Sequence, residues 1–101
     1  MIDHIVLIRW KEAATTPQIH ALKPAFESLR NIAGVRDVRF ESNLGRAKKE
    51  YGRGIAHVLT VSMQDLDSLE RFGPHPVHRE MSAHVMVLAE EIIIVDIERE
   101  A

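Results

Sequence analysis

The sequence contains no cysteine, and aromatic residues make up only 5% of its 101 residues. Without cysteine, the protein has no disulfide framework, no thiolate nucleophile and no cysteine ligands for an iron–sulfur cluster. An excess of either charge is also lacking, because the formal net charge is −2 and the pI is about 6.3. The chain thus lacks the excess of basic residues that favours nucleic-acid binding, and we expect no nucleic-acid partner.

No apolar run is long enough to cross a membrane. The most apolar stretch, residues 85–95, is interrupted by Glu90 and Glu91 and falls short of the roughly 20 apolar residues that a spanning helix needs. The first residues carry no basic region, and the apolar run at residues 5–8 is too short for a signal peptide. We therefore expect a cytoplasmic protein without a membrane partner.

The overall composition of the chain is that of an ordinary globular protein. Hydrophobic residues make up 46% of the chain and charged residues 28%. A chain of this length builds about one hydrophobic core. The sequence therefore predicts one domain over residues 1–101.

Hydrophobic periodicity predicts four strands. They are expected at residues 2–11, 35–40, 55–63 and 92–97, where apolar residues alternate or run together. The polar, glycine-bearing segment at residues 42–54 is expected to be an exposed loop.

Apolar residues at helical spacing predict a helix after residue 15 and two further helical segments after residue 64. The start signals of the first are Thr16 followed by Pro17, or a capping box of Thr15 and Gln18. Pro24 lies inside this helix and predicts a kink, since proline removes one backbone hydrogen bond. Asp65 is a good N-cap for a short helix, and the prolines at 74 and 76 separate that helix from a longer one.

The predicted order is β-α-β-β-α-β, which is the α+β ferredoxin-like arrangement with an antiparallel four-stranded sheet. In that fold the helices cover one face of the sheet. Residues 2–11 and 92–97 are apolar on both faces, so the uncovered face is expected to be apolar as well. An exposed apolar face of several hundred Å² indicates a partner, and we expect a second copy of the chain.

Three stretches of the sequence are similar to motifs of one family. They are DHIVL at residues 3–7, GIAHV at residues 54–58 and HPVH at residues 75–78. In this order, and across nearly the whole chain, they resemble the stress-responsive A/B barrel domain (Dabb) family. The resemblance implies a dimeric α/β barrel, in which two ferredoxin-like sheets face each other.

The resemblance also implies a candidate site. The family includes plant stress-associated proteins and a polyketide cyclase, in which the second histidine of the His-Pro-x-His motif is the base. That position is His78 here, and the resemblance places His4 and His57 at the same pocket. Two tyrosines of the cyclase correspond to Phe26 and Phe72, which lack the hydroxyl. We therefore do not expect the cyclase reaction itself.

The residues themselves leave two interpretations of these histidines open. His4 and His57 lie on apolar strand faces, as buried histidines with satisfied hydrogen bonds or as polar groups on a pocket wall. His78 lies near a helix N-terminus, which disfavours imidazolium and favours a neutral base. The expected pocket residues are Val6, Ile8, Phe26, Leu59, Phe72 and His75. In its Pro-His-Pro turn, His75 has the alternative role of satisfying backbone groups.

No cofactor or transition-metal site is expected. His75, His78 and His84 do not share one side of a helix, and a transition metal needs three or four convergent ligands. Some family members hold magnesium through main-chain carbonyls, and the resemblance places that position at residues 31–35. The basic segment at residues 45–54 shows no nucleotide-binding pattern and is interpreted as a solvated loop, with a lid over the pocket as the alternative.

Three functions follow as hypotheses. The first is a homodimer of unassigned activity that binds a small hydrophobic ligand in a pocket lined by histidines. The second is a cofactor-independent enzyme, cyclase-like or an isomerase, with His78 as general base and His4 and His57 beside it. The third is a haem-degrading or quinol-type monooxygenase, because the family shares its architecture with such enzymes.

Overall fold

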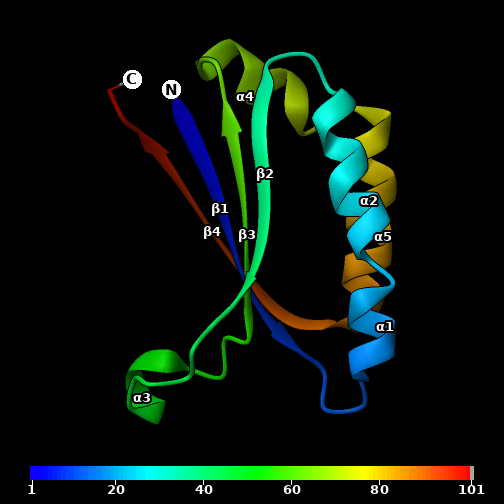
Figure 1. Ribbon diagram of the computed structural model, residues 1–101, viewed down its shortest axis with the longest axis vertical. Coiled ribbons are helices and arrows are strands. Elements are labelled where there is room, and N and C mark those ends of the chain that lie inside the picture. The colour runs from blue at the N-terminus through cyan, green and yellow to red at the C-terminus, as the bar shows by residue number, and fades with distance from the viewer. Residues whose placement is uncertain (101) are drawn as a thin grey trace.

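The computed structural model describes residues 1–100 and forms one antiparallel sheet with helices on one side (Figure 1). Its elements follow the predicted β-α-β-β-α-β order, which confirms the ferredoxin-like fold. The strands are β1 (Ile2–Trp10), β2 (Val35–Ser42), β3 (His57–Met63) and β4 (Ala89–Glu98). The helices are α1 (Thr16–His20), α2 (Lys23–Ser28), α3 (Lys49–Gly52), α4 (Leu66–Phe72) and α5 (Pro76–Leu88), and a 3-10 turn spans Leu29–Asn31.

The strand order in the sheet is β2-β3-β1-β4, so β1 lies between β3 and β4. Both pairings of β1 are antiparallel and fix which residues lie side by side. Val6 is opposite Leu59 on β3 and Ile94 on β4. The outer edges of β2 and β4 have no neighbouring strand within residues 1–100.

The first helical region is broken rather than kinked. Thr15 is the N-cap of α1, and Thr15 and Gln18 form the reciprocal capping box that the sequence offers as one of two starts. The helix ends at His20, and α2 begins at Lys23 with Pro24 in its first turn. Because proline has no N–H and clashes with the preceding turn, it is tolerated at a helix start and not inside a helix.

The later helices begin where the sequence predicts. The Asp65 carboxylate accepts the N–H of Ser68 at 2.9 Å and caps α4. Helix α5 begins at Pro76 and runs without interruption into β4 at Ala89, three residues earlier than the strand expected from Ile92. The segment expected as a loop, residues 42–54, contains the single-turn helix α3.

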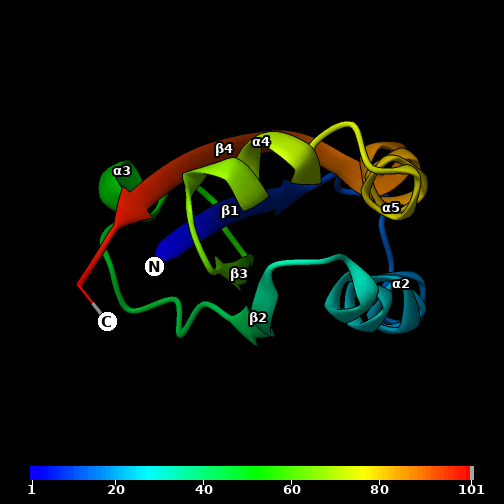
Figure 2. The same cartoon turned by 90° about the horizontal axis from the view of Figure 1, so that it is seen from above.

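One hydrophobic core fills the space between the sheet and the helices. It includes the side chains of Ile8, Leu59 and Val61 from the strands and of Phe26 and Met81 from the helices, all buried. From above, helices α2 and α5 lie side by side along the same side of the curved sheet (Figure 2). The candidate site residues described below also lie on this helix side of the sheet.

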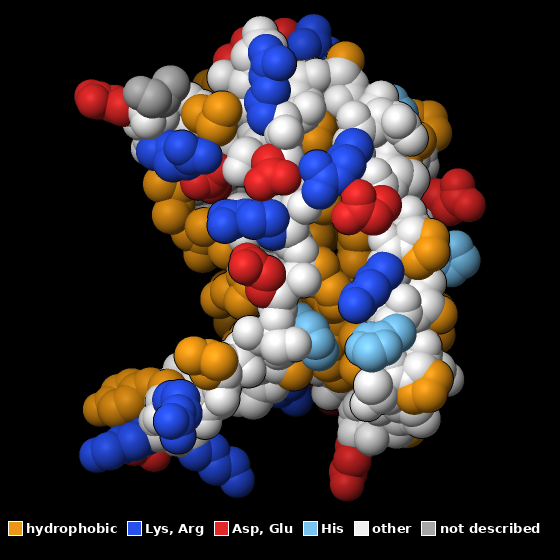
Figure 3. Space-filling model, in the orientation of Figure 1, with side chains coloured by type: hydrophobic (Ala, Val, Ile, Leu, Met, Phe, Trp, Pro, Cys, Tyr) orange, Lys and Arg blue, Asp and Glu red, His pale blue; other side chains and the backbone are white. Residues whose placement is uncertain are grey.

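The other face of the sheet is uncovered and apolar, as the sequence predicts. Ile93, Val95 and Ile97 of β4 point away from the helices and are 39%, 42% and 45% exposed. Their neighbours on β1 include Ile5 and Leu7. Hydrophobic side chains show along this flank in Figure 3, above the projecting segment that carries α3.

Candidate ligand cavity and its histidines

A cavity of about 320 Å³ lies between the sheet and α5. Its walls come from β1, β3, β4, α4 and α5. The lining residues are His4, Val6, Ile8, Leu59, Phe72, His78, Met81, Ser82, Val85, Met86, Ile92 and Ile94. The wall is therefore largely apolar, with two imidazoles and one hydroxyl.

His4 lies in the middle of β1 and is buried. Its Nδ1 is 2.5 Å from Oδ1 of Asp96, which lies opposite it on β4. A carboxylate accepts hydrogen bonds, so the proton of His4 lies on Nδ1 and Nε2 is the acceptor of the neutral ring. The edge of the ring contacts Phe72, with ring centroids 5.5 Å apart.

His78 lies in the first turn of α5, and its ring centroid is 4.6 Å from that of Phe72. Its Nδ1 donates to the carbonyl oxygen of Gly73 at 2.9 Å, which again leaves Nε2 as the acceptor. Burial lowers the pKa of His78, against the raising effect of the Gly73 carbonyl, and positive charge on His4 or His75 lowers it further. A neutral ring at pH 7 is thereby favoured.

The two cavity histidines share one arrangement. In each, Nδ1 is held from outside the cavity, by a carboxylate for His4 and by a main-chain carbonyl for His78. Neither Nε2 has a hydrogen-bond partner within residues 1–100. Such a pair can accept hydrogen bonds from a bound molecule or take up a proton from it.

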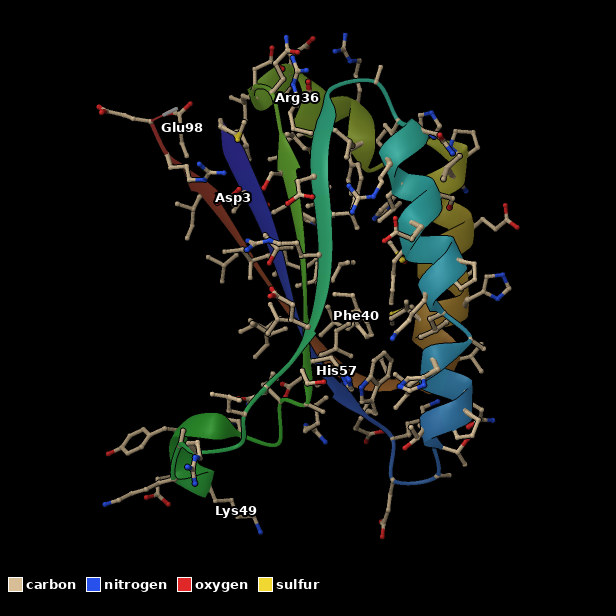
Figure 4. All side chains as sticks on the ribbon, in the orientation of Figure 1. Asp3, Arg36, Phe40, Lys49, His57 and Glu98 are labelled. Carbon is tan, nitrogen blue, oxygen red and sulfur yellow. The ribbon has the colours of Figure 1, made fainter. Side chains whose placement is uncertain are left out.

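His57 lies outside this cavity. The indole Nε1 of Trp10 donates to its Nδ1 at 2.8 Å, and its ring stacks on Phe40 at 4.8 Å between centroids. Figure 4 shows His57 and Phe40 together on the helix side of the sheet. Burial lowers the pKa of His57, and the positive charges of His20 and Lys23 lower it further. The expectation of one pocket with His4, His57 and His78 is therefore not met.

Two other expected pocket residues do not line the cavity either. Phe26 is buried against Phe40, with ring centroids 4.5 Å apart. His75 is the N-cap of α5, and its Nδ1 accepts the N–H of Val77 at 3.1 Å. The structure thus gives His75 the backbone-satisfying role that the sequence offers as its alternative. Val6, Ile8, Leu59 and Phe72 do line the cavity.

Asp96 is the partner that sequence reasoning missed. It lies two residues after Ile94 on the same face of β4, and that alternation was the available signal. The pairing of His4 with Asp96 depends on the register of β1 and β4, which connects opposite ends of the chain.

No three histidine or acidic side chains gather as metal ligands in the part of the chain that the structure describes. At the proposed main-chain magnesium position, the Ile32 carbonyl accepts the Val35 N–H at 3.1 Å and the Gly34 carbonyl accepts the Gln64 N–H at 2.8 Å. Each of those two oxygens thus accepts a hydrogen bond within the fold. Within residues 1–100, no helix is long and apolar enough to span a bilayer.

Comparisons with known proteins agree with this architecture. The family model described as Stress responsive A/B Barrel Domain matches residues 2–99. The stress-response A/B barrel domain-containing protein At5g22580 of Arabidopsis thaliana is 23% identical over 96 residues, 92% of this chain and 81% of that protein.

Two solved structures with the same fold are also similar. A dimeric ferredoxin-like protein of unknown function from Thermobifida fusca superposes with a TM-score of 0.81 at 23% identity, over 95% of this chain and 88% of its own. The hydroxynitrile lyase of Passiflora edulis superposes with a TM-score of 0.82 at 22% identity, over 95% and 90%. At these identities the likeness shows the fold alone.

Proposed function

The chain belongs to the stress-responsive A/B barrel domain family, and on that basis we propose that it is a homodimer whose cavity binds a small, mainly apolar molecule. The cavity between the sheet and α5 is the site. The observation that carries the proposal is the pair of histidines, His4 and His78, whose acceptor nitrogens have no partner within residues 1–100 of an otherwise apolar wall.

The uncovered sheet face supports the homodimer. Ile5, Leu7, Ile93, Val95 and Ile97 form a continuous apolar surface across β1 and β4. Burying such a face against a copy of itself is favourable, because each apolar side chain leaves water on both protomers. The Thermobifida fusca protein with this fold is described as dimeric.

The first test is native mass spectrometry of the untagged protein. We expect a mass near twice 11.5 kDa. Additional mass retained under native conditions would identify a ligand directly. A bare monomer would contradict the homodimer.

Ligand binding is tested with 1-naphthol, an apolar molecule with one hydroxyl donor, by isothermal titration calorimetry. We expect His78→Ala to weaken binding by about fivefold, the effect of one hydrogen bond of about 1 kcal/mol. His84→Ala, on the same helix outside the cavity, is the matched control and is expected to bind like wild type. Naphthalene, without the hydroxyl, is expected to bind both variants equally. Equal 1-naphthol affinities for both variants would contradict a role for His78.

A second candidate function is acid–base catalysis with His78 as the base. The observation that favours it is the Gly73 carbonyl, which holds the proton of His78 on Nδ1 and leaves Nε2 free to accept one. The Passiflora edulis relative by fold is a hydroxynitrile lyase, so cleavage of a cyanohydrin is the reaction to try. The substrate hydroxyl would lose its proton to Nε2 as the carbon–carbon bond to cyanide breaks, which leaves an aldehyde and cyanide.

Mandelonitrile cleavage, followed by the absorbance of benzaldehyde, tests this candidate. We expect the rate to rise with pH through the lowered pKa of His78, because only the neutral ring accepts a proton. His78→Ala is expected to abolish the rate and His84→Ala to retain it. Turnover that survives His78→Ala would assign any activity to other groups, and no turnover above the buffer rate would leave ligand binding as the function.

A further inference from the structure

The segment between β2 and β3 projects from the protein on the side of the sheet away from the helices (Figures 1 and 2). We call residues 43–55 the arm. It contains α3, and none of the residues of α3 is buried. The side chains of Leu44 and Tyr51 on the arm are 89% and 78% exposed. Two large side chains are thus held in water beside an uncovered apolar sheet.

The arm has a defined conformation without a core of its own. Asn43 is fixed to the far end of the arm by two hydrogen bonds, from its main-chain N–H to Ala56 at 2.9 Å and from Nδ2 to Ile55 at 2.7 Å. The Ala56 N–H in turn donates to the Ile8 carbonyl of β1 at 2.9 Å. A single helical turn is not stable in isolation. The arm is therefore anchored to the sheet at its base, while the large apolar side chains that it carries are left uncovered.

The charges of the arm complement those of β4. Residues 43–55 contain four basic residues, Arg46, Lys48, Lys49 and Arg53, and one acid, Glu50. Strand β4 contains four acids, Glu90, Glu91, Asp96 and Glu98, and no basic residue. Within one protomer, Asp96 pairs with His4 and Glu91 with Arg9, which leaves Glu90 and Glu98 as the acids without an ion-pair partner in residues 1–100. Lys49 extends outward from the arm in Figure 4. In a two-fold dimer, every contact between a basic arm and an acidic strand occurs twice.

A hollow of about 670 Å³ connects the arm to the sheet. It is lined by Arg9 and Glu91 from the ends of β1 and β4 and by Lys49, Glu50 and Arg53 from the arm, together with Gly54. The arm therefore continues the uncovered face into a raised rim. A second copy that covered the apolar face would meet this rim.

We propose that the arm clasps the second copy of the chain, with Leu44 and Tyr51 packed on that copy and the basic residues facing its acidic β4. This inference rests on the homodimer proposed above and extends it from the sheet face to a second contact surface. Burial of two large side chains per protomer adds apolar area to the interface. Charge attraction between the arm and β4 makes association depend on salt.

The test compares dimer dissociation constants by sedimentation at serial dilution. The double variant Leu44→Ser and Tyr51→Ser is expected to raise the dissociation constant at least tenfold. Leu66→Ser is the matched control, because Leu66 is 57% exposed on α4, away from the arm, and is expected to change it less than twofold. Circular dichroism is expected to be unchanged in all variants, since the three side chains are exposed.

The outcomes separate the arm from the dimer itself. A monomeric wild type would overturn both the homodimer and the arm contact. A dimeric wild type whose dissociation constant is unchanged in the double variant would overturn the arm contact alone.

Because the chain has no cysteine, a single introduced thiol gives an independent readout. Leu44→Cys is expected to react with a thiol reagent at least tenfold more slowly at concentrations where the protein is dimeric than at dilution. Leu66→Cys is expected to react at the same rate in both. Equal protection of the two thiols, or none at position 44, would contradict the clasp.

Discussion

Trp10 and His57 form a hydrogen-bonded pair, so protonation of His57 changes the environment of the Trp10 indole. Trp10 is the single tryptophan of the chain, and its indole donates to Nδ1 of His57. Protonation of His57 places a proton on Nδ1 and removes that acceptor. We therefore expect the fluorescence of Trp10 to depend on the charge state of His57.

We predict that the fluorescence changes with a midpoint below pH 6.5, since burial and nearby positive charge lower the pKa of His57 in the folded state. The unfolded chain then binds the proton more readily, so the free energy of unfolding falls as pH decreases from 6.5 to the folded-state pKa. His57→Gln keeps a hydrogen-bond acceptor but does not titrate, and is expected to show no midpoint. A midpoint at or above 6.5, or one that persists in His57→Gln, would contradict this assignment.

At the scale of the elements, the turn before β2 holds α4 close to the sheet through a glycine. Gly34 has a φ of +90°, and a Cβ there would lie 2.2 Å from Oγ of the buried Ser68. Its carbonyl also accepts the N–H of Gln64 at 2.8 Å. Both the backbone conformation and the space therefore require glycine.

We predict that Gly34→Ala lowers the free energy of unfolding by at least about 2 kcal/mol in urea denaturation. Gly52 is the matched control, because it lies in α3 without a positive φ and an added Cβ there would make only an ordinary contact, 3.7 Å from Cβ of Ala47. Gly52→Ala is expected to be neutral or to stabilise by up to about 1 kcal/mol. Equal losses in the two variants would rule out the close approach to Ser68 as the cause.

Local sequence patterns predicted which helices and strands form better than they predicted which residues lie side by side in the fold. The capping residues Thr15 and Asp65 and the alternation along β1 are signals that neighbouring residues carry, and the structure confirms them. Pro24 was correctly located as a disruption but breaks the helix. Helix α3 was missed because a single turn has no periodicity to detect.

The candidate site required information that local patterns do not contain. His4 and His57 both face the helices, as the strand periodicity indicates. Register places His57 opposite Ile8 and His4 opposite Val61, which sets the two imidazoles apart along the sheet. The contact between His4 and Asp96 depends on pairing of the first strand with the last. Such long-range pairings cannot be read from spacing alone.

At the scale of the whole molecule, the uncovered sheet face is the surface on which the proposed homodimer depends. Val95 lies on that face of β4 and is opposite Ile5 on β1. We predict that Val95→Lys converts the proposed dimer to a folded monomer, because an unpaired ammonium group in an apolar interface loses its hydration on both protomers. Sedimentation measures the change in mass.

Val87→Lys is the control for this prediction, since Val87 is 68% exposed on α5, on the helix side. It is expected to leave the assembly unchanged. Retention of the wild-type mass by Val95→Lys, with an unchanged circular dichroism spectrum, would show that the chain associates through another surface.

The strand order also favours one sequence of events during folding. The central strand β1 comes first in the chain, yet its two neighbours in the sheet are the third and the fourth strands. The β2–β3 hairpin is the sole pairing between consecutive strands in residues 1–100, so it is the part of the sheet that loop-closure entropy opposes least. In pulse-labelling hydrogen exchange, we expect the amides shared by β2 and β3 to gain protection before those shared by β1 and β4. Until β4 arrives, His4 has no Asp96 beside it, and the cavity is therefore among the last features of the protein to form.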